Sequence, residues 1–147
     1  MKILFVCTGN TCRSPIAAAI MNKIAKENEM DVTASSAGIF AEVGSGASEN
    51  AVKAMRFYGI SLKDHKSTQL SEAMINESDL VLTMTEGQRA MIEGYAPDKI
   101  FSLYGFFGYG DYEITDPYGG DLSEYEQVAE EIYDVLVDLA EALVQND

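Results

Sequence analysis

Short apolar runs alternate along this chain with longer segments in which apolar residues recur at helical spacing. The runs are typical of buried strands and fall at residues 3–6, 32–36, 80–84 and 100–103. The helical spacing predicts helices at residues 16–28, 48–58 and 69–76, another from 85 and a last one from 123. Strands and helices that alternate over short connections indicate a parallel α/β sheet with right-handed crossovers. We therefore expect one domain over residues 1–147, with four parallel strands covered by helices on both faces.

Several predicted helices begin at residues that suit a helix N-terminus. Ser48 can cap the helix at residues 48–58. Thr85 with Gln88, and Ser123 with Glu126, have the spacing of capping boxes that open the last two helices. The final helix carries one apolar stripe, which we interpret as core packing.

The first apolar run ends at Cys7 and is followed by a short polar loop, Arg13 and a helix start at Pro15. Gly9 and Asn10 tolerate the positive φ that lets successive backbone N–H groups of such a loop point inward. Arg13 can grip two oxygens of a phosphate with its planar guanidinium, and the helix adds the positive end of its dipole. These groups can hold a tetrahedral anion against the sulfur and favour the thiolate of Cys7 as a nucleophile.

A simpler interpretation makes Cys7 a buried cysteine at a strand end and Arg13 a surface charge. The strand before Cys7, the Gly-Asn pair inside the loop and the Ser-Pro pair after it favour the anion site instead.

The segment from Cys7 to Pro15 reads Cys-Thr-Gly-Asn-Thr-Cys-Arg-Ser-Pro and resembles the phosphate loop of the low-molecular-weight protein tyrosine phosphatase family. The resemblance covers nearly the whole chain and implies a three-layer, phosphotyrosine phosphatase I-like fold with the sheet order 2-1-3-4. It implies that Cys7 is the nucleophile and that Arg13 binds the phosphate. The same loop supplies the other phosphate-binding positions that the resemblance implies: Thr8, Gly9, Asn10, Thr11, Cys12 and Ser14.

Outside the loop, the resemblance implies roles for side chains far along the chain. Asp116, in an Asp-Pro-Tyr segment of the long loop at residues 104–121, is expected to be the general acid. Phe40 and Tyr118 are expected to form side walls of the active-site mouth and to influence specificity.

The resemblance also implies a brace for the loop. Ser14, Ser36 and His65 are expected to hydrogen-bond around Asn10 and hold its strained backbone. From the residues alone, His65 would instead be interpreted as a solvated turn histidine.

Thr11 bears on the substrate. The segment Thr-Gly-Asn-Thr-Cys resembles the bacterial protein-arginine phosphatases, whereas tyrosine-specific members usually carry isoleucine at the position of Thr11. We therefore expect hydrolysis of phosphoarginine in proteins through a cysteinyl-phosphate intermediate.

Three alternatives stay open at this point. A tyrosine phosphatase would use the same catalytic residues. An arsenate reductase shares the fold and the nucleophile but normally requires a further downstream cysteine, and none follows Cys12. A phosphate-binding module without turnover would require neither Cys7 nor Asp116.

The two cysteines lie in one loop, so Cys12 can capture a sulfenic acid formed on Cys7 before it is overoxidised. Two cysteines and one histidine give neither a disulfide scaffold nor a zinc ligand set, and we expect no metal and no other cofactor.

Charge excludes some classes of partner. The formal net charge is −14, and half of the 24 acidic residues follow Lys99, the last basic residue. Such a field argues against binding to nucleic acid or to anionic membranes, and no apolar run reaches membrane-spanning length. We expect a cytoplasmic monomer whose substrate is a phosphorylated protein.

Overall fold

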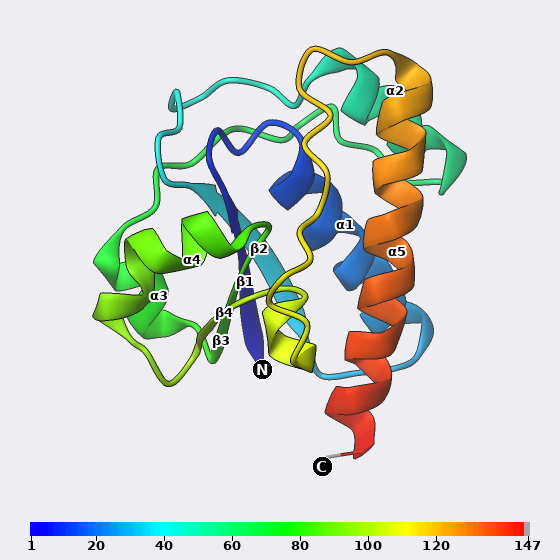
Figure 1. The fold of residues 1–147 in the computed structure, drawn as a ribbon. Coiled ribbons are helices and arrows are strands. Elements are labelled where there is room, and N and C mark those ends of the chain that lie inside the picture. Colours follow the sequence, from blue (N-terminus) through cyan, green and yellow to red (C-terminus); the bar gives the residue numbers. More distant parts are fainter. Residues whose placement is uncertain (146–147) are drawn as a thin grey trace.

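The computed structural model describes residues 1–145, and its centre is a four-stranded, all-parallel sheet in the order β2-β1-β3-β4 (Figure 1). The strands are β1 (Lys2–Cys7), β2 (Thr33–Gly38), β3 (Leu80–Thr83) and β4 (Ile100–Ser102). The parallel sheet and the strand order expected from the sequence are confirmed. Each observed strand lies within two residues of its predicted ends.

Helices cover both faces of the sheet, as expected (Figure 1). Alternate side chains of a strand point to opposite faces, so Ile3 and Phe5 of β1 join one core cluster and Leu4 and Val6 join the other. The first cluster is closed by α1 (Arg13–Glu27), α2 (Glu49–Phe57) and α5 (Leu122–Gln145). The second is closed by α3 (Glu72–Glu77) and α4 (Glu86–Ile92). Because both faces are buried, β1 and β3 are apolar along almost their whole length.

Two of the three predicted helix caps form, and one does not. The Ser48 side chain accepts the N–H of Ala51, and the predicted capping box of Thr85 with Gln88 forms at the start of α4. The predicted capping box at Ser123 is wrong. The carboxylate of Asp121 accepts the N–H of Glu124 at 3.0 Å, and α5 therefore begins before Ser123.

Two short 3-10 helices complete the fold, η1 (Glu93–Tyr95) and η2 (Gly105–Phe107). The second lies within the segment at residues 104–121 that the sequence indicated as a continuous loop. After η2 the chain crosses the carboxyl end of the sheet, where the N–H of Ile114 donates to the carbonyl of Met84 at 3.1 Å. Within residues 1–145, no helix is both long and apolar enough to cross a membrane.

Parallel strands end at the same edge of a sheet, and β1 lies between β2 and β3, where the chain order of the strands reverses. Such a switch point leaves a crevice at the carboxyl ends of the strands. Cys7 is the last residue of β1 and therefore lies at this crevice.

Candidate active site

The loop between β1 and α1 turns around Asn10, which has a φ of 58° and is fully buried. Its side chain explains why a residue other than glycine can hold this left-handed conformation. The Asn10 amide donates to the hydroxyls of Ser14 and Ser36, each at 2.9 Å, and its oxygen accepts the N–H of Thr68 at 2.9 Å. Every polar group of the side chain is thereby used within the protein.

The backbone carbonyl of Asn10 is held as firmly as its side chain. It accepts hydrogen bonds from the ring of His65 at 2.7 Å and from the hydroxyl of Ser67 at 2.9 Å. The structure therefore brings Ser14, Ser36 and His65 together around Asn10. Sequence reasoning missed Ser67 and Thr68, because a serine and a threonine in a polar segment carry no signal of a contact almost sixty positions away.

Strand β2 and its continuation support the first residues of the loop. The N–H groups of Ile39 and Phe40 donate to the carbonyls of Cys7 and Thr8 at 3.0 and 2.9 Å. At Gly38 a Cβ atom would lie 2.7 Å from the carbonyl oxygen of Thr8. This position therefore requires glycine, because the loop packs directly on its backbone.

The Cys7 sulfur is buried and faces two hydrogen-bonding groups. Its Sγ atom lies 2.8 Å from the hydroxyl of Ser14 and accepts the N–H of Asn10 at 3.3 Å. Since the Ser14 hydroxyl already accepts a hydrogen bond from Asn10, its own proton is free for the sulfur. Both contacts suit a negatively charged sulfur.

Arg13 is the first residue of α1, and only 6% of its surface is exposed. One end of the guanidinium donates to the carbonyl of Ile114 at 2.9 Å, and Nη2 lies 3.7 Å from Oδ2 of Asp116. The other carboxylate oxygen of Asp116 accepts the N–H of Tyr118 at 3.1 Å. The loop before α5 thus orients Arg13 through Ile114 and places Asp116 beside the guanidinium of Arg13.

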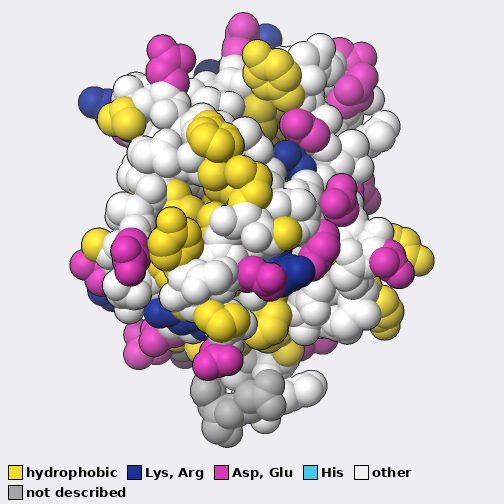
Figure 2. All heavy atoms as spheres, turned by 60° about the vertical axis from the view of Figure 1, so that its left-hand side comes forward, with side chains coloured by type: hydrophobic (Ala, Val, Ile, Leu, Met, Phe, Trp, Pro, Cys, Tyr) yellow, Lys and Arg dark blue, Asp and Glu magenta, His cyan; other side chains and the backbone are white. Residues whose placement is uncertain are grey.

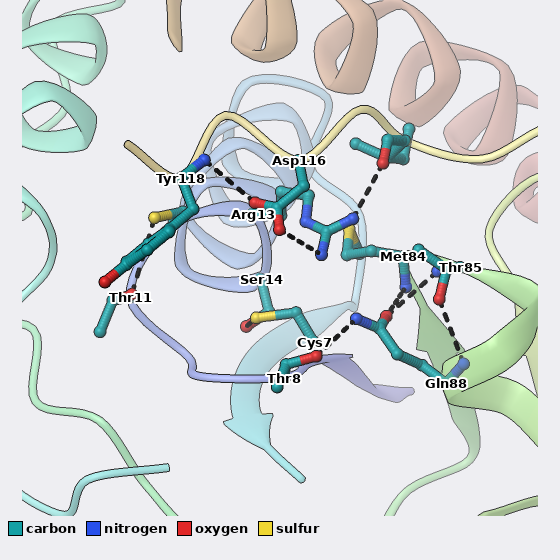
Figure 3. A network of polar contacts seen from close by, with 12 residues as sticks. Cys7, Thr8, Thr11, Arg13, Ser14, Met84, Thr85, Gln88, Asp116 and Tyr118 are labelled. Carbon is teal, nitrogen blue, oxygen red and sulfur yellow. Dashed lines mark hydrogen bonds and ion pairs between the residues drawn. The ribbon is translucent and has the colours of Figure 1, made fainter. Parts of the chain in front are cut away.

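The loop after β1 and the segment before α5 form a cavity of about 300 Å³ (Figure 3). The cavity is lined by Cys7, Thr8, Gly9, Thr11, Cys12, Arg13, Asp116 and Tyr118. Tyr118 is exposed and lines the cavity on the side of Thr11. Phe40 is not among the residues that line this cavity: 69% of its surface is exposed, and its backbone N–H donates to the carbonyl of Thr8.

Cys12 lines the cavity and also contacts α5 and the N-terminus of α2. Its sulfur lies 3.2 Å from the hydroxyl of Tyr125 and 3.6 Å from that of Ser48, and both cysteines are free thiols. Burial and the hydrogen bond to Cys12 raise the pKa of Tyr125 to about 12. The phenol therefore stays neutral at physiological pH and keeps its proton for hydrogen bonding.

Gln88, in the first turn of α4, is a further contact that the sequence did not reveal as part of the site. Its side-chain oxygen accepts the N–H groups of Met84 and Thr85, and its amide nitrogen donates to the hydroxyl of Thr8 at 3.1 Å (Figure 3). The capping box correctly predicted its place on the helix but gave no sign of the contact with the loop.

The chain carries a formal net charge of −14. Figure 2 shows that Asp and Glu side chains outnumber Lys and Arg on the face that it presents. Attraction for an anion must therefore come from short range, from Arg13 and the loop N–H groups. Within residues 1–145 no cluster of His, Cys, Asp and Glu has the form of a metal site.

Comparison with known proteins agrees with this geometry. The model of the family described as low molecular weight phosphotyrosine protein phosphatase matches residues 2–147. A protein-arginine-phosphatase of Geobacillus stearothermophilus is 42% identical over 147 residues, which cover 97% of this chain and 95% of the relative.

Two solved structures are similar over almost the whole chain. The C7S mutant of the YwlE arginine phosphatase, with a phosphorylated active-site serine, has a TM-score of 0.93 at 38% identity and covers 97% of this chain and 95% of its own. A low molecular weight protein tyrosine phosphatase from T. tengcongensis has a TM-score of 0.92 at 40% identity and covers 97% and 99%.

A cysteine and an arginine that line one cavity, on this fold and with these relatives, define a cysteine-dependent phosphatase. The chain belongs to the low molecular weight phosphotyrosine protein phosphatase family. The resemblance and the fold expected from the sequence are thereby confirmed.

Proposed function

We propose that this protein hydrolyses phosphoarginine in proteins through a cysteinyl-phosphate intermediate. The observation that carries the proposal is the shared cavity, in which the sulfur of Cys7, the guanidinium of Arg13 and the carboxylate of Asp116 meet. The arginine-phosphatase relatives support the choice of substrate.

In the first step the thiolate of Cys7 attacks phosphorus in line with the bond that breaks. The loop N–H groups and Arg13 stabilise the charge on the equatorial oxygens, and they are held in place before the substrate arrives. Asp116 protonates the leaving nitrogen. This proton is needed because neutral arginine is strongly basic, with a conjugate-acid pKa above ~12.

In the second step water cleaves the sulfur–phosphorus bond. Asp116, now a carboxylate, takes a proton from the water, and inorganic phosphate leaves. The exposed position of Asp116 at the mouth allows both proton transfers, since 57% of its side-chain surface is exposed.

Thr11 is proposed to set the preference for arginine. It lines the cavity beside Tyr118, and its hydroxyl would provide a polar neighbour for a guanidinium. An isoleucine at this position would offer apolar packing to a phenyl ring instead.

A tyrosine phosphatase is the second candidate. The T. tengcongensis relative favours it, because that protein is 40% identical and is described as a tyrosine phosphatase. The catalytic steps would be unchanged, but the leaving phenol, with a pKa near ~10, would depend less on protonation.

Turnover of matched phosphoarginine and phosphotyrosine peptides by the parent and by Thr11→Ile separates the two candidates. We expect the parent to prefer phosphoarginine and Thr11→Ile to shift the ratio of kcat/KM toward phosphotyrosine by about ten- to a hundredfold. A parent that prefers phosphotyrosine would favour the second candidate. An unchanged ratio in Thr11→Ile would remove Thr11 as the discriminating residue.

We further propose that the protein acts as a monomer in the cytoplasm and binds no nucleic acid. Both cysteines are free thiols, which suits a reducing compartment, and the net charge of −14 argues against binding to nucleic acid. The family match from residue 2 to residue 147 supports a single domain.

Cys12 is proposed to protect the nucleophile. Peroxide oxidises Cys7 to a sulfenic acid, and the Cys12 thiol then displaces water from it to form a disulfide that a thiol reductant reopens. Cys12→Ala should therefore recover less activity with dithiothreitol after peroxide than the parent does. Equal recovery would contradict this role.

A further inference from the structure

The side-chain amide of Gln88 can adopt only one of its two orientations. Its oxygen accepts two backbone N–H groups, those of Met84 and Thr85, each at 3.1 Å. An amide nitrogen cannot accept a hydrogen bond, so a flipped amide would face both donors without bonding to either. The side chain is almost completely buried, which makes such a flip costly.

The fixed orientation directs the amide nitrogen of Gln88 at the hydroxyl oxygen of Thr8, 3.1 Å away. The Thr8 hydroxyl is therefore the acceptor in this contact, and its proton has to point elsewhere. Among residues 1–145 that proton has no protein acceptor. Thr8 is exposed and lines the cavity together with Cys7 and Arg13, so the free donor lies where a phosphoryl group would bind (Figure 3).

The choice of glutamine at this position points to the same role. A glutamate would complete the capping box equally well, and its charge would interact better with the N-terminus of a helix. What glutamine adds is the N–H that donates to Thr8. Glutamate is common in this chain, which has 24 acidic residues. The contact with Thr8 gives a reason for glutamine at position 88 instead.

We propose that Gln88 is a positioning residue that presents the Thr8 hydroxyl proton to a phosphoryl oxygen of the bound substrate. Thr8 thereby adds a side-chain donor to the backbone donors of the loop. This inference rests on the proposed phosphatase function; it adds Gln88 to the site and gives the Thr8 hydroxyl a defined role there.

The test is Gln88→Glu, which keeps the shape and the capping contact. One carboxylate oxygen still accepts from Met84 and Thr85, but the other can only accept from Thr8, so the Thr8 proton turns away from the cavity. We expect the inhibition constant of inorganic phosphate to rise about ten- to a hundredfold, with a similar loss in kcat/KM. The thermal midpoint should stay close to that of the parent, because the capping box is retained.

Thr8→Val and the double variant separate hydrogen bonding from the added charge. Thr8→Val removes the donor and also the acceptor of the Gln88 amide, adds no charge, and should weaken phosphate binding to a similar extent. In the Thr8→Val background, Gln88→Glu should have a much smaller effect than in the parent. Gln127→Glu adds the same charge on the exposed side of α5 and should leave phosphate binding unchanged.

Three results would overturn the inference. The first is unchanged phosphate binding in Gln88→Glu, and the second is unchanged binding in Thr8→Val. The third is an equal effect of Gln88→Glu with and without the Thr8 hydroxyl, which would mean that charge alone acts. A parent that does not bind phosphate at all would instead refute the proposed function, and this inference with it.

Discussion

The sulfur of Cys7 lies 2.8 Å from the hydroxyl oxygen of Ser14, and the same hydroxyl accepts a hydrogen bond from Asn10 at 2.9 Å. A thiolate can only accept a hydrogen bond, so when Cys7 is ionised the Ser14 hydroxyl donates to its sulfur. The residue that braces the loop therefore also solvates the proposed nucleophile.

Ser14→Ala should reduce kcat by about tenfold or more, since a hydrogen bond to a charged group contributes roughly 1.5–3 kcal/mol. The rate of alkylation of Cys7 by iodoacetamide at pH 7 should fall as well, and Cys12→Ala can serve as the background so that a single thiol reacts. A fall in kcat with an unchanged alkylation rate would show that Ser14 only braces Asn10.

Asp116→Asn should affect substrates according to how much their leaving group depends on a proton. We expect kcat for a phosphoarginine peptide to fall at least on the order of a hundredfold. An activated aryl phosphate, whose phenolate leaves without protonation, should lose far less. The ratio of the two losses is the measurement, and equal losses would make Asp116 a structural residue or place its action in a later step.

Gly38→Ala should destabilise the protein and disturb the loop together. A Cβ atom at this position would meet the carbonyl oxygen of Thr8 at 2.7 Å, and neither backbone can move freely. Overpacking of this kind costs about 1–3 kcal/mol in the free energy of unfolding, measured by urea denaturation. Gly46→Ala is the matched control, because no atom lies within 4 Å of its Cβ position. Equal stability of the two variants would contradict the close packing.

Tyr125→Phe tests the buried phenol beside Cys12. Because burial raises the pKa of Tyr125 to about 12, from 10 in the unfolded chain, the phenol stabilises the fold fully below pH 10 and loses this contribution as the pH rises toward 12. At pH 11 the loss amounts to about 1.4 kcal/mol.

The difference in unfolding free energy between the parent and Tyr125→Phe should therefore shrink by about this amount from pH 9 to pH 11. Tyr104, whose pKa is also raised to about 12, is present in both proteins and cancels in the comparison. A difference that does not change with pH would contradict the raised pKa of Tyr125.

The spacing of apolar residues predicted the strands and helices well. What it missed depends on contacts between segments that are distant in sequence. The apolar runs located all four strands, because strands buried on both faces are continuously apolar. The strand order came from the resemblance of the loop, not from the pattern. The cap of α5 was placed at Ser123 because the spacing of a capping box does not distinguish it from a neighbouring aspartate that folds back.

In the site, residues close in sequence to Cys7 were predicted more completely than residues that reach it through the fold. Ile114 orients Arg13 through a backbone carbonyl, which no side-chain motif records. Gln88 belongs to a capping box whose sequence signature is the same whether or not the side chain also donates to Thr8. Phe40 follows β2 as expected, but its ring faces solvent, and nothing in the sequence distinguishes that orientation from the cavity wall.

The most direct test of the central claim is the mass of the protein after a rapid denaturing quench during turnover of a phosphoarginine peptide. We expect one added phosphoryl group on Cys7, formed and lost within the time of a turnover. Cys7→Ser should release no phosphate continuously, because a serine hydroxyl at this position is a far weaker nucleophile than a thiolate. Steady phosphate release without a phosphoryl group on Cys7, or release by Cys7→Ser at the parent's rate, would contradict the proposal. A phosphoryl group that appears with phosphotyrosine peptide alone would contradict the arginine substrate.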